Sequence, residues 1–461
     1  MKIGYSLWSL VLLALTPFCV AAPVEPAAVS APESGQAPAE VDAAFTKIAT
    51  NATYGCRRPH GYGLYDPVVD KTFICWNGPG MSVMGMSYDN ATGQWSPEKT
   101  ICKLNYVGTW DYHNYPNMAM APDGHLLITW ADHNDNLQIA RAPEPHSMEG
   151  EWSHQLIETR NDCYPIIFSV DGRVYIFYSV TGDRLWPYRS FGYVYSDDSG
   201  QTWSDHINAI DSDQKDPDHI DEVYAYHMSV QPADGDQPAR VHFVWVMRGG
   251  PNGHNQGSRN AYMATFYPES GTWEAPDGSD LGEIIDLDEM LDYCTVLDTG
   301  SILAEKLVNR ILVSEYSDGS LLVIYNNRSE CWEAVWDGDT WQHRKLADIA
   351  AKDLEPMPDG SHRLLLSTEG QTAMEMYIQQ EKGGEWVKTF EKVVPYADGA
   401  DRTWSMAFID HSRPEVDILM SQLKLGEEKN DYSGSWPVWT VDTSSAAIPV
   451  AEGDSLPVSQ E

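Results

Sequence analysis

The chain has 461 residues, of which 42% are hydrophobic, which is enough for one large domain or two ordinary ones. Its 68 acidic residues against 30 Lys and Arg give a formal net charge of −38. This balance argues against nucleic acid as a partner, because phosphate binding needs a basic surface. It still permits binding of a polyanion in a locally basic cleft, since salt screens exposed charges that are more than about 10 Å apart.

The first 21 residues have the pattern of a secretory signal. Lys2 precedes a largely apolar run over residues 7–20, and the small residues around Ala21 suit a cleavage site. The apolar run is too short to be read as a membrane span, and no later segment is long enough. We therefore expect a secreted or periplasmic protein that has no membrane partner.

Two segments have the composition of disordered chain. Residues 22–42 are rich in Pro, Ala and Glu and hold almost no large apolar side chains, and residues 444–461 are similar. The sequence therefore predicts one ordered domain over residues 43–443.

Within this domain, the repeating signal is a strand, a turn that contains Gly, and a second strand. Asp123-Gly124, Asp171-Gly172 and Asp318-Gly319 each lie between apolar runs, which is a strong hairpin signal. Helical periodicity is nearly absent, and the best candidate for a helix is one short segment within residues 281–293. The sequence predicts an all-β chain.

A slower repeat predicts the architecture. Turns that end in Trp recur at intervals of 45 to 70 residues, each long enough for one four-stranded unit with its loops. Residues 196–203 match the Asp-box pattern S-x-D-x-G-x-T-W, a structural turn whose Trp we expect to be buried between blades. With a last unit over residues 402–443, the pattern predicts a seven-bladed β-propeller with four-stranded antiparallel blades. The six tryptophans of these turns are Trp95, Trp152, Trp203, Trp273, Trp341 and Trp386.

The cysteines leave three interpretations open, of which the first is pairing as disulfides in an oxidising compartment. Strand-like surroundings favour buried thiols for several of the six that follow the signal segment. A structural metal ion, Ca²⁺ or Zn²⁺, held in part by His227, Cys294 and Cys331 is the third, although no close ligand spacing supports it. We expect no cofactor to be required for catalysis. The six residues are Cys56, Cys75, Cys102, Cys163, Cys294 and Cys331.

Two His-Asn pairs bracket one predicted hairpin. His113-Asn114 precedes the first strand and His133-Asn134 closes the second, with Asp123-Gly124 between them. The hairpin allows the two imidazoles to reach one face. Two ordinary loop histidines are the alternative interpretation.

The next two segments bring a phenol and several arginines. Tyr178 ends a strand at the point that His133 occupies in the preceding unit, and Arg184 and Arg189 follow it in a predicted loop. A guanidinium can bind a carboxylate or a sulfate through two hydrogen bonds. Further residues of this kind, at which we expect substrate contacts, are Arg58, Tyr226, Arg248, His254 and Arg259.

These motifs, taken in order, resemble those of the BNR-4-type repeat propellers, and within them the seven-bladed ulvan lyases. The resemblance spans residues 50–440 and rests on His113-Asn-x-Pro, His133-Asn, Tyr164-Pro and the loop from Arg248 to Tyr262. It implies cleavage between 3-sulfated rhamnose and glucuronic or iduronic acid, leaving a 4,5-unsaturated uronate. By position, it implies that His113 and His133 are the active-site histidines, Tyr178 the catalytic tyrosine, Arg189 or Arg184 the carboxylate neutraliser, and Tyr226 a further cleft residue.

The chemistry of β-elimination fits these residue types. Removal of H5 from a uronate needs donors that stabilise the enediolate-like transition state, a base, and an acid near the leaving O4. We predict His113 or Tyr178 as the base, with Tyr178 also able to protonate the leaving oxygen. The predicted partner is therefore an acidic sulfated polysaccharide, bound by a monomer. A propeller glycoside hydrolase, such as a rhamnosidase, and a non-catalytic carbohydrate-binding propeller remain alternatives.

Overall fold

The computed structural model divides the chain into two units, Met1–Val41 and Asp42–Glu461, and every residue described here belongs to the second. Among the described residues, no helix is long and apolar enough to cross a membrane. The described ranges are 42–53, 62–104, 115–131, 135–181, 188–212, 221–249, 257–300, 308–368, 372–400, 402–424 and 434–444.

Three four-stranded antiparallel sheets make up the C-terminal part of this unit. The first contains β20 (Val308–Glu315), β21 (Leu321–Asn327), β22 (Glu330–Trp336) and β23 (Trp341–Ala347). The second contains β24 (Ala350–Pro356), β25 (His362–Ser367), β26 (Ala373–Gln379) and β27 (Val387–Val393). The third contains β28 (Arg402–Phe408), β29 (Ile418–Leu423), β30 (Trp436–Val441) and the N-terminal strand β1 (Phe45–Ala52).

The N-terminal part holds a five-stranded and a thirteen-stranded sheet. The five-stranded sheet contains β2 (Gly63–Asp66), β3 (Lys71–Asn77), β4 (Val83–Asp89), β5 (Gln94–Trp95) and β6 (Lys99–Cys102). The thirteen-stranded sheet contains β7 (Asn117–Met120), β8 (Leu126–Ala131), β9 (Asp135–Arg141), β10 (Ser153–Val170), β11 (Arg173–Thr181), β12 (Tyr188–Ser196), β13 (Ile207–Ile210), β14 (Asp221–Gln231), β15 (Arg240–Arg248), β16 (Arg259–Tyr267), β17 (Thr272–Glu274), β18 (Asp280–Gly282) and β19 (Thr295–Leu297).

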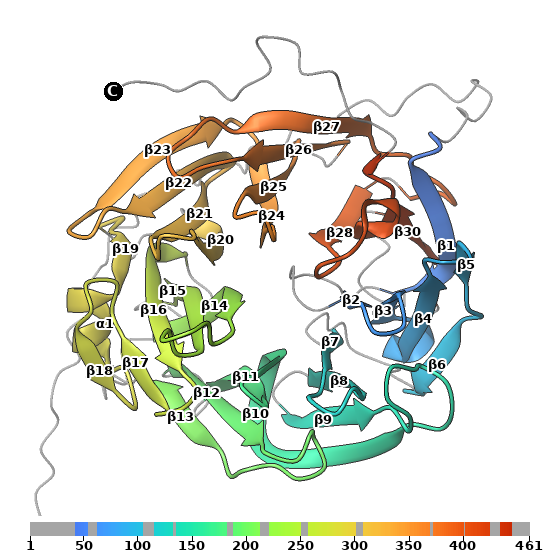
Figure 1. Cartoon of the computed structure of the whole chain (residues 1–461), viewed down its shortest axis with the longest axis horizontal. Helices are drawn as coiled ribbons and strands as arrows, with labels where there is room; N and C mark the ends of the chain where they lie inside the picture. The colour runs from blue at the N-terminus through green and yellow to red at the C-terminus, as the bar shows by residue number, and fades with distance from the viewer. Residues whose placement is uncertain are drawn as a thin grey trace, which may run out of the picture. The chain divides into compact units, whose positions relative to one another are not determined.

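The thirteen-stranded sheet consists of antiparallel units, which are joined by one long shared strand and by one parallel pairing. The strand β10 pairs with β9 along its first part and with β11 along its second part. The strands β12 and β14 pair in parallel through Tyr188–Asp221 and Arg189–Glu222. All other pairings between the named strands are antiparallel, so the prediction of an all-β chain is confirmed. Within this unit the sheets follow one another in chain order around a common axis (Figure 1).

The apolar core lies between neighbouring sheets. One buried cluster packs Leu322 and Ile324 of β21 against Leu364 and Leu366 of β25. Another packs Leu365 of β25 against Met420 of β29. Because β25 is buried on both faces, its side chains join the sheet before it to the sheet after it, which is how stacked sheets share a core.

The predicted turns are confirmed. Asp123-Gly124, Asp171-Gly172 and Asp318-Gly319 join β7 to β8, β10 to β11 and β20 to β21, and each Gly has a positive φ between 79° and 85°. In the Asp-box turn, Asp198 accepts hydrogen bonds from the amides of Gln201 and Thr202 and from the Thr202 hydroxyl.

Two details differ from the predictions. The tryptophans of the repeated turns are buried at Trp152, Trp273 and Trp386, whereas Trp95, Trp203 and Trp341 remain partly exposed. The helix α1 (Leu287–Tyr293) occupies only the second half of the segment in which a helix was predicted, because Asp286 and Glu289 form a capping box that fixes its start. Within the described ranges, the other helical turns are η1 (Pro79–Met81) and η3 (Pro414–Val416).

The structure does not bring the ligand atoms of the alternative metal ligands His227, Cys294 and Cys331 within 4.8 Å of one another. Cys294 and Cys331 are buried in separate apolar clusters, where burial raises the pKa of each thiol. Among the described residues, the only group that brings three possible ligand atoms within 4.8 Å of one another is Glu355, Asp410 and His411.

Candidate active site

Strand register gathers several of the predicted site residues at one end of the thirteen-stranded sheet. The parallel pair Arg189–Glu222 joins the starts of β12 and β14, and Glu222 also pairs with Arg248 at the end of β15. Met247 pairs with Arg259 at the start of β16. We call this end of the sheet the site end. Arg189, which is far from Arg248 and Arg259 in the sequence, therefore lies near both along this end of the sheet.

Arg189 is a strand residue, not a loop residue as the sequence suggested. It is the second residue of β12, and its side chain is 1% exposed. Its Nη1 donates a hydrogen bond of 3.2 Å to the Tyr224 hydroxyl, and its Nε lies 4.0 Å from Oε1 of the equally buried Glu222. Burial alone lowers the pKa of the guanidinium, but the acidic groups around it, Cys163 and Tyr224 first, outweigh burial and raise that pKa. Arg189 therefore stays charged inside the protein.

Arg248 also lies close to the ring of Tyr224. Its guanidinium carbon is 4.6 Å from the ring centroid of Tyr224 and 5.8 Å from that of Tyr226, and Nη2 donates a hydrogen bond to the Tyr226 hydroxyl. The guanidinium carbon of Arg189 is 5.2 Å from the Tyr224 ring. One aromatic ring thus contacts both cations, and such contacts stabilise a cation by about 0.5–2 kcal/mol.

Two more buried tyrosines extend this group. The Tyr164 ring is 5.5 Å from Tyr224, 6.3 Å from Tyr115 and 5.6 Å from the guanidinium carbon of Arg189. Tyr164 has a φ of 59° beside a register shift in β10, a left-handed backbone that is costly for an aromatic residue. Strained backbone and bulges of this kind concentrate at functional sites. We call Arg189, Arg248, Tyr115, Tyr164, Tyr224 and Tyr226 the arginine–tyrosine cluster.

The cluster can stabilise negative charge. Two guanidiniums are held in fixed positions with one buried carboxylate, Glu222, at 4.0 Å from Arg189. Burial raises the pKa of Tyr224 well above its usual value, so this phenol remains a neutral donor. Fixed donors and cations in a dry environment are what the transition state of a reaction that builds up negative charge requires.

Tyr178 lies outside this cluster. It is fully buried on β11 in the apolar contact with β8 and β9, and its hydroxyl is 2.6 Å from Nδ1 of His206. Nε2 of His206 is 2.9 Å from Oδ1 of Asn208. If Nε2 donates to that oxygen, Nδ1 is the acceptor of a hydrogen bond from the Tyr178 hydroxyl.

The remaining predicted site residues have different positions. Arg259 is partly exposed at the start of β16, and its Nη1 donates a hydrogen bond of 3.4 Å to the carbonyl of Gly249. His113, Asn114, His133, Arg184, His254 and Arg58 lie outside the described residues.

Sequence reasoning did not select Tyr115, Tyr164, Tyr224, Glu222 or His206 as site residues. The sequence did contain a signal for Tyr224. Tyr224 and the selected Tyr226 are two residues apart in one strand, and side chains at this spacing point to the same face of a sheet. For Tyr164, Glu222 and His206, the contacts are made across sheets or strands, and no local pattern specifies them.

A second polar group lies between the inner strands β14, β20 and β24. Nδ1 of His227 accepts a hydrogen bond of 3.2 Å from the amide of Val313, and Nε2 lies 3.8 Å from Oδ1 of Asp353. Burial lowers the pKa of His227 to about 3 and raises that of Asp353 to about 8. This group ties three strands together without a formal ion pair.

A family model and one curated relative each match part of this chain. A family model described as "BNR repeat-containing family member" matches residues 71–349. An ulvan lyase of Pseudoalteromonas sp. (strain PLSV) is 22% identical over 234 residues, which are 46% of this chain and 47% of that protein, so the match spans about half the length of this curated relative.

Solved structures extend the likeness over most of the chain. An ulvan lyase of polysaccharide lyase family PL25, bound to -[GlcA(1-4)Rha3S]-, has a TM-score of 0.67 at 15% identity, covering 86% of this chain and 96% of that chain. The polysaccharide lyase Uly1 has a TM-score of 0.53 at 13% identity, with 86% and 93% covered. At these identities the likeness establishes a shared fold.

Proposed function

This chain belongs to the BNR repeat-containing family, and from that premise we propose that it is an exported polysaccharide lyase that cleaves ulvan at its uronic acids by β-elimination. The observation that carries the proposal is the arginine–tyrosine cluster, in which Arg189 and Arg248 both contact the Tyr224 ring. The fold shared with an ulvan lyase bound to glucuronic acid and 3-sulfated rhamnose supports it.

The proposed reaction has three parts. The positive charges of the partly exposed Arg248 and of the buried Arg189 stabilise the negative charge that develops on the uronate carboxylate when H5 leaves. His113 or Tyr178 takes the proton, and Tyr178 returns one to the O4 of the leaving sugar. The products are a 4,5-unsaturated uronate and a new free hydroxyl on the neighbouring sugar.

The other predicted residues keep their proposed roles. His133 is the second active-site histidine. Asn114, Tyr226, Arg184, His254, Arg259 and Arg58 contact the substrate, and Arg184 is the alternative to Arg189 as neutraliser. The proposed enzyme is a monomer that acts outside the cytoplasm, and its catalysis requires no cofactor.

We also propose that the domain over residues 43–443 is a propeller of seven blades. Seven strands support this count. Each is the first strand of an antiparallel unit and pairs with the strand that follows it in the chain. These strands are β2, β7, the second part of β10, β14, β20, β24 and β28. The amide of Tyr65 in β2 donates to the carbonyl of Asp410, which follows β28, so the first and last of these strands lie close together. In this arrangement β1, paired with β30, closes the ring.

The test is incubation of the purified protein with ulvan, followed by ultraviolet absorbance of the unsaturated product and its mass spectrum. A lyase product is lighter by one water than the hydrolytic product of the same size. Reducing ends without this absorbance would indicate a hydrolase, and binding without turnover would indicate a lectin. Either result would overturn the proposal.

A further inference from the structure

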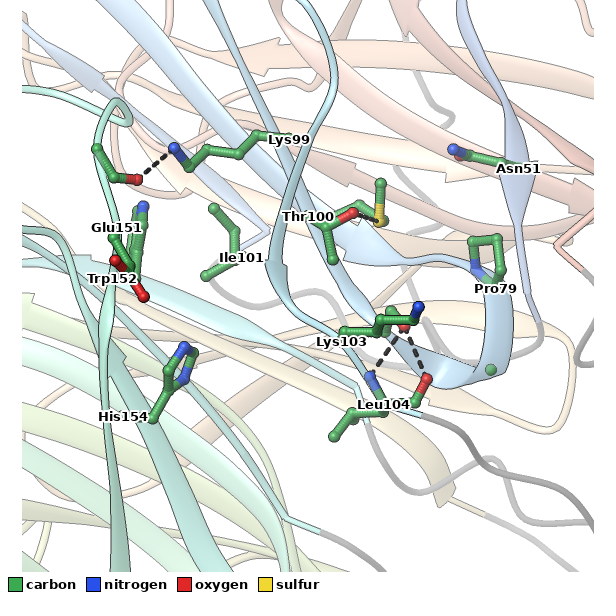
Figure 2. Close-up of a pocket in the computed structure, with 14 residues that line it drawn as sticks. Asn51, Pro79, Lys99, Thr100, Ile101, Lys103, Leu104, Glu151, Trp152 and His154 are labelled. Carbon is green, nitrogen blue, oxygen red and sulfur yellow. Dashed lines mark hydrogen bonds between the residues drawn. The ribbon is translucent and has the colours of Figure 1, made fainter.

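A recess of about 850 Å³ lies on the flank of the domain and shares no residue with the arginine–tyrosine cluster. The edge strand β6 and the turn η1 form one side, and residues 150–154 at the start of β10 form the other. Figure 2 shows Lys99 and Lys103 on the β6 side, with Trp152 and His154 opposite them. A volume in this range is typical of pockets that bind small ligands. We call this recess the flank groove.

The groove is locally basic on a strongly acidic chain. Nζ of Lys99 donates a hydrogen bond of 2.5 Å to the carbonyl of Gly150, a neutral partner. Within the described parts of the chain, no carboxylate lies within 4.0 Å of Lys99 or Lys103, whereas Lys345 and Lys388 each have two such partners. Both ammonium groups are therefore available to an anion from outside.

The rest of the lining suits a sugar. His154 is exposed and adds a third cation when it is protonated, while Glu151 is the one carboxylate among the described lining residues. Leu104 is partly exposed and provides apolar surface beside the charged groups, whereas the lining residues Ile101 and Trp152 are buried. An acidic sugar needs this combination, because its ring carries an apolar face as well as a carboxylate or sulfate.

We propose that the flank groove is a second binding site for an acidic polysaccharide. Lys99 and Lys103 bind anionic groups of one part of the polysaccharide, while another part of the same polysaccharide molecule binds at the arginine–tyrosine cluster. The choice of a sulfated uronate polymer as ligand rests on the proposed function. A second site raises the effective concentration of a long chain at the first site without changing the chemistry there.

The kinetic test is the double variant Lys99→Gln/Lys103→Gln. Loss of two exposed charge contacts should raise the KM for long ulvan chains about threefold to tenfold. The kcat and the KM for a short ulvan oligosaccharide should not change, because a short ligand cannot span both sites. The matched control is Lys382→Gln/Lys392→Gln, which removes the same charge where the lysines already pair with Asp318 and Asp42, and which should leave all constants unchanged.

A binding test separates this proposal from the proposed reaction. Migration of the wild type in a native gel that contains ulvan should be retarded, and the groove variant should lose part of this retardation while the control variant retains it. A gel with a neutral glucan should retard none of them. If the wild type is retarded, the groove variant loses part of this retardation and neither protein cleaves ulvan, the groove is supported as a binding site and the lyase proposal is wrong. Equal retardation of the groove and control variants, or an equal rise in KM for short and long substrates, would overturn the groove.

Discussion

Replacement of Arg189 by Met tests the centre of the proposed site, because it removes the charge and keeps much of the apolar stem. Arg189 and Glu222 are each 1% exposed. Removing one partner of a buried pair leaves the other charge uncompensated, which destabilises a protein by about 3–5 kcal/mol. We expect the free energy of unfolding of Arg189→Met to fall by this amount in a urea titration with an unchanged m-value.

The double variant Arg189→Met/Glu222→Gln separates stability from catalysis. Removing both charges should restore most of the lost stability, since replacing a complete buried pair by neutral groups is often neutral or favourable. Turnover of ulvan should stay at least about 100-fold below wild type in both variants, because the loss of one donor to a developing anion has that effect on kcat.

A control lies at the opposite end of β15. Arg240 pairs there with the largely buried Glu315 at 2.5 Å, so Arg240→Met should also lose stability but keep its turnover at a temperature where it is folded. The assay is unsaturated-product absorbance on folded protein at 25 °C. If Arg189→Met/Glu222→Gln regained the turnover of the wild type, Arg189 would contribute to stability alone and not to catalysis. A single variant as stable as wild type would show that the buried pair contributes nothing.

Three further changes address the remaining groups. In Tyr178→Phe, loss of the hydroxyl that lies 2.6 Å from His206 should lower the free energy of unfolding by only about 1 kcal/mol, and turnover by at least about 100-fold; a folded variant with full turnover removes Tyr178 from the mechanism. Asp198→Ala should lower the melting temperature by a few degrees and leave kcat unchanged, since Asp198 serves only its own turn; a selective loss of kcat would contradict this. In His227→Gln, the melting temperature should fall less than in the wild type when the pH is lowered from 6.5 to 4. Burial holds the pKa of His227 at about 3 in the folded protein, whereas the imidazole of the unfolded wild type takes up a proton near pH 6.5, so acid favours unfolding only where this histidine is present. Identical pH profiles of the two proteins would assign the fall in melting temperature to other groups.

Local signals predicted much of the fold. An Asp-Gly pair between two runs of alternating apolar and polar residues favours a hairpin. In the Asp-box turn, Asp198 accepts hydrogen bonds only from residues within four positions of it in the sequence. The capping box of Asp286 and Glu289 was also readable, and it marks a later helix start than the one predicted. Each of these features is encoded within about five residues, which is why a single sequence reveals them.

Long-range pairings could not be predicted in the same way. The strand β1 completes its sheet by pairing with β30, so Phe45 lies opposite Val441 across almost the whole chain. The parallel contact of β12 with β14 joins two units that the turn pattern treats as separate. Neither pairing has a local sequence signal, because the hydrophobic pattern of a strand fixes which face is buried and leaves its partner open.

Two pairings place Arg189 in a strand, although the sequence predicted a loop there. Arg189 pairs antiparallel with Thr181 of β11 and in parallel with Glu222 of β14. The parallel pairing carries Arg189 to Tyr224, two residues further along β14. The selected residues Arg189, Tyr226 and Arg248 were therefore found one by one from residue type, while the arrangement that unites them depends on a tertiary contact.

The charge of the chain and the chemistry of the cluster are compatible for a physical reason. A formal net charge of −38 repels a polyanion at a distance, but salt screens exposed charges beyond about 10 Å, and a higher salt concentration shortens that range further. The guanidiniums of Arg189 and Arg248 act at short range, where both contact the ring of Tyr224 and Arg248 donates a hydrogen bond to the Tyr226 hydroxyl. Raising the salt concentration should therefore increase the rate of polymer capture by weakening the repulsion, while the buried contacts that stabilise the transition state change little.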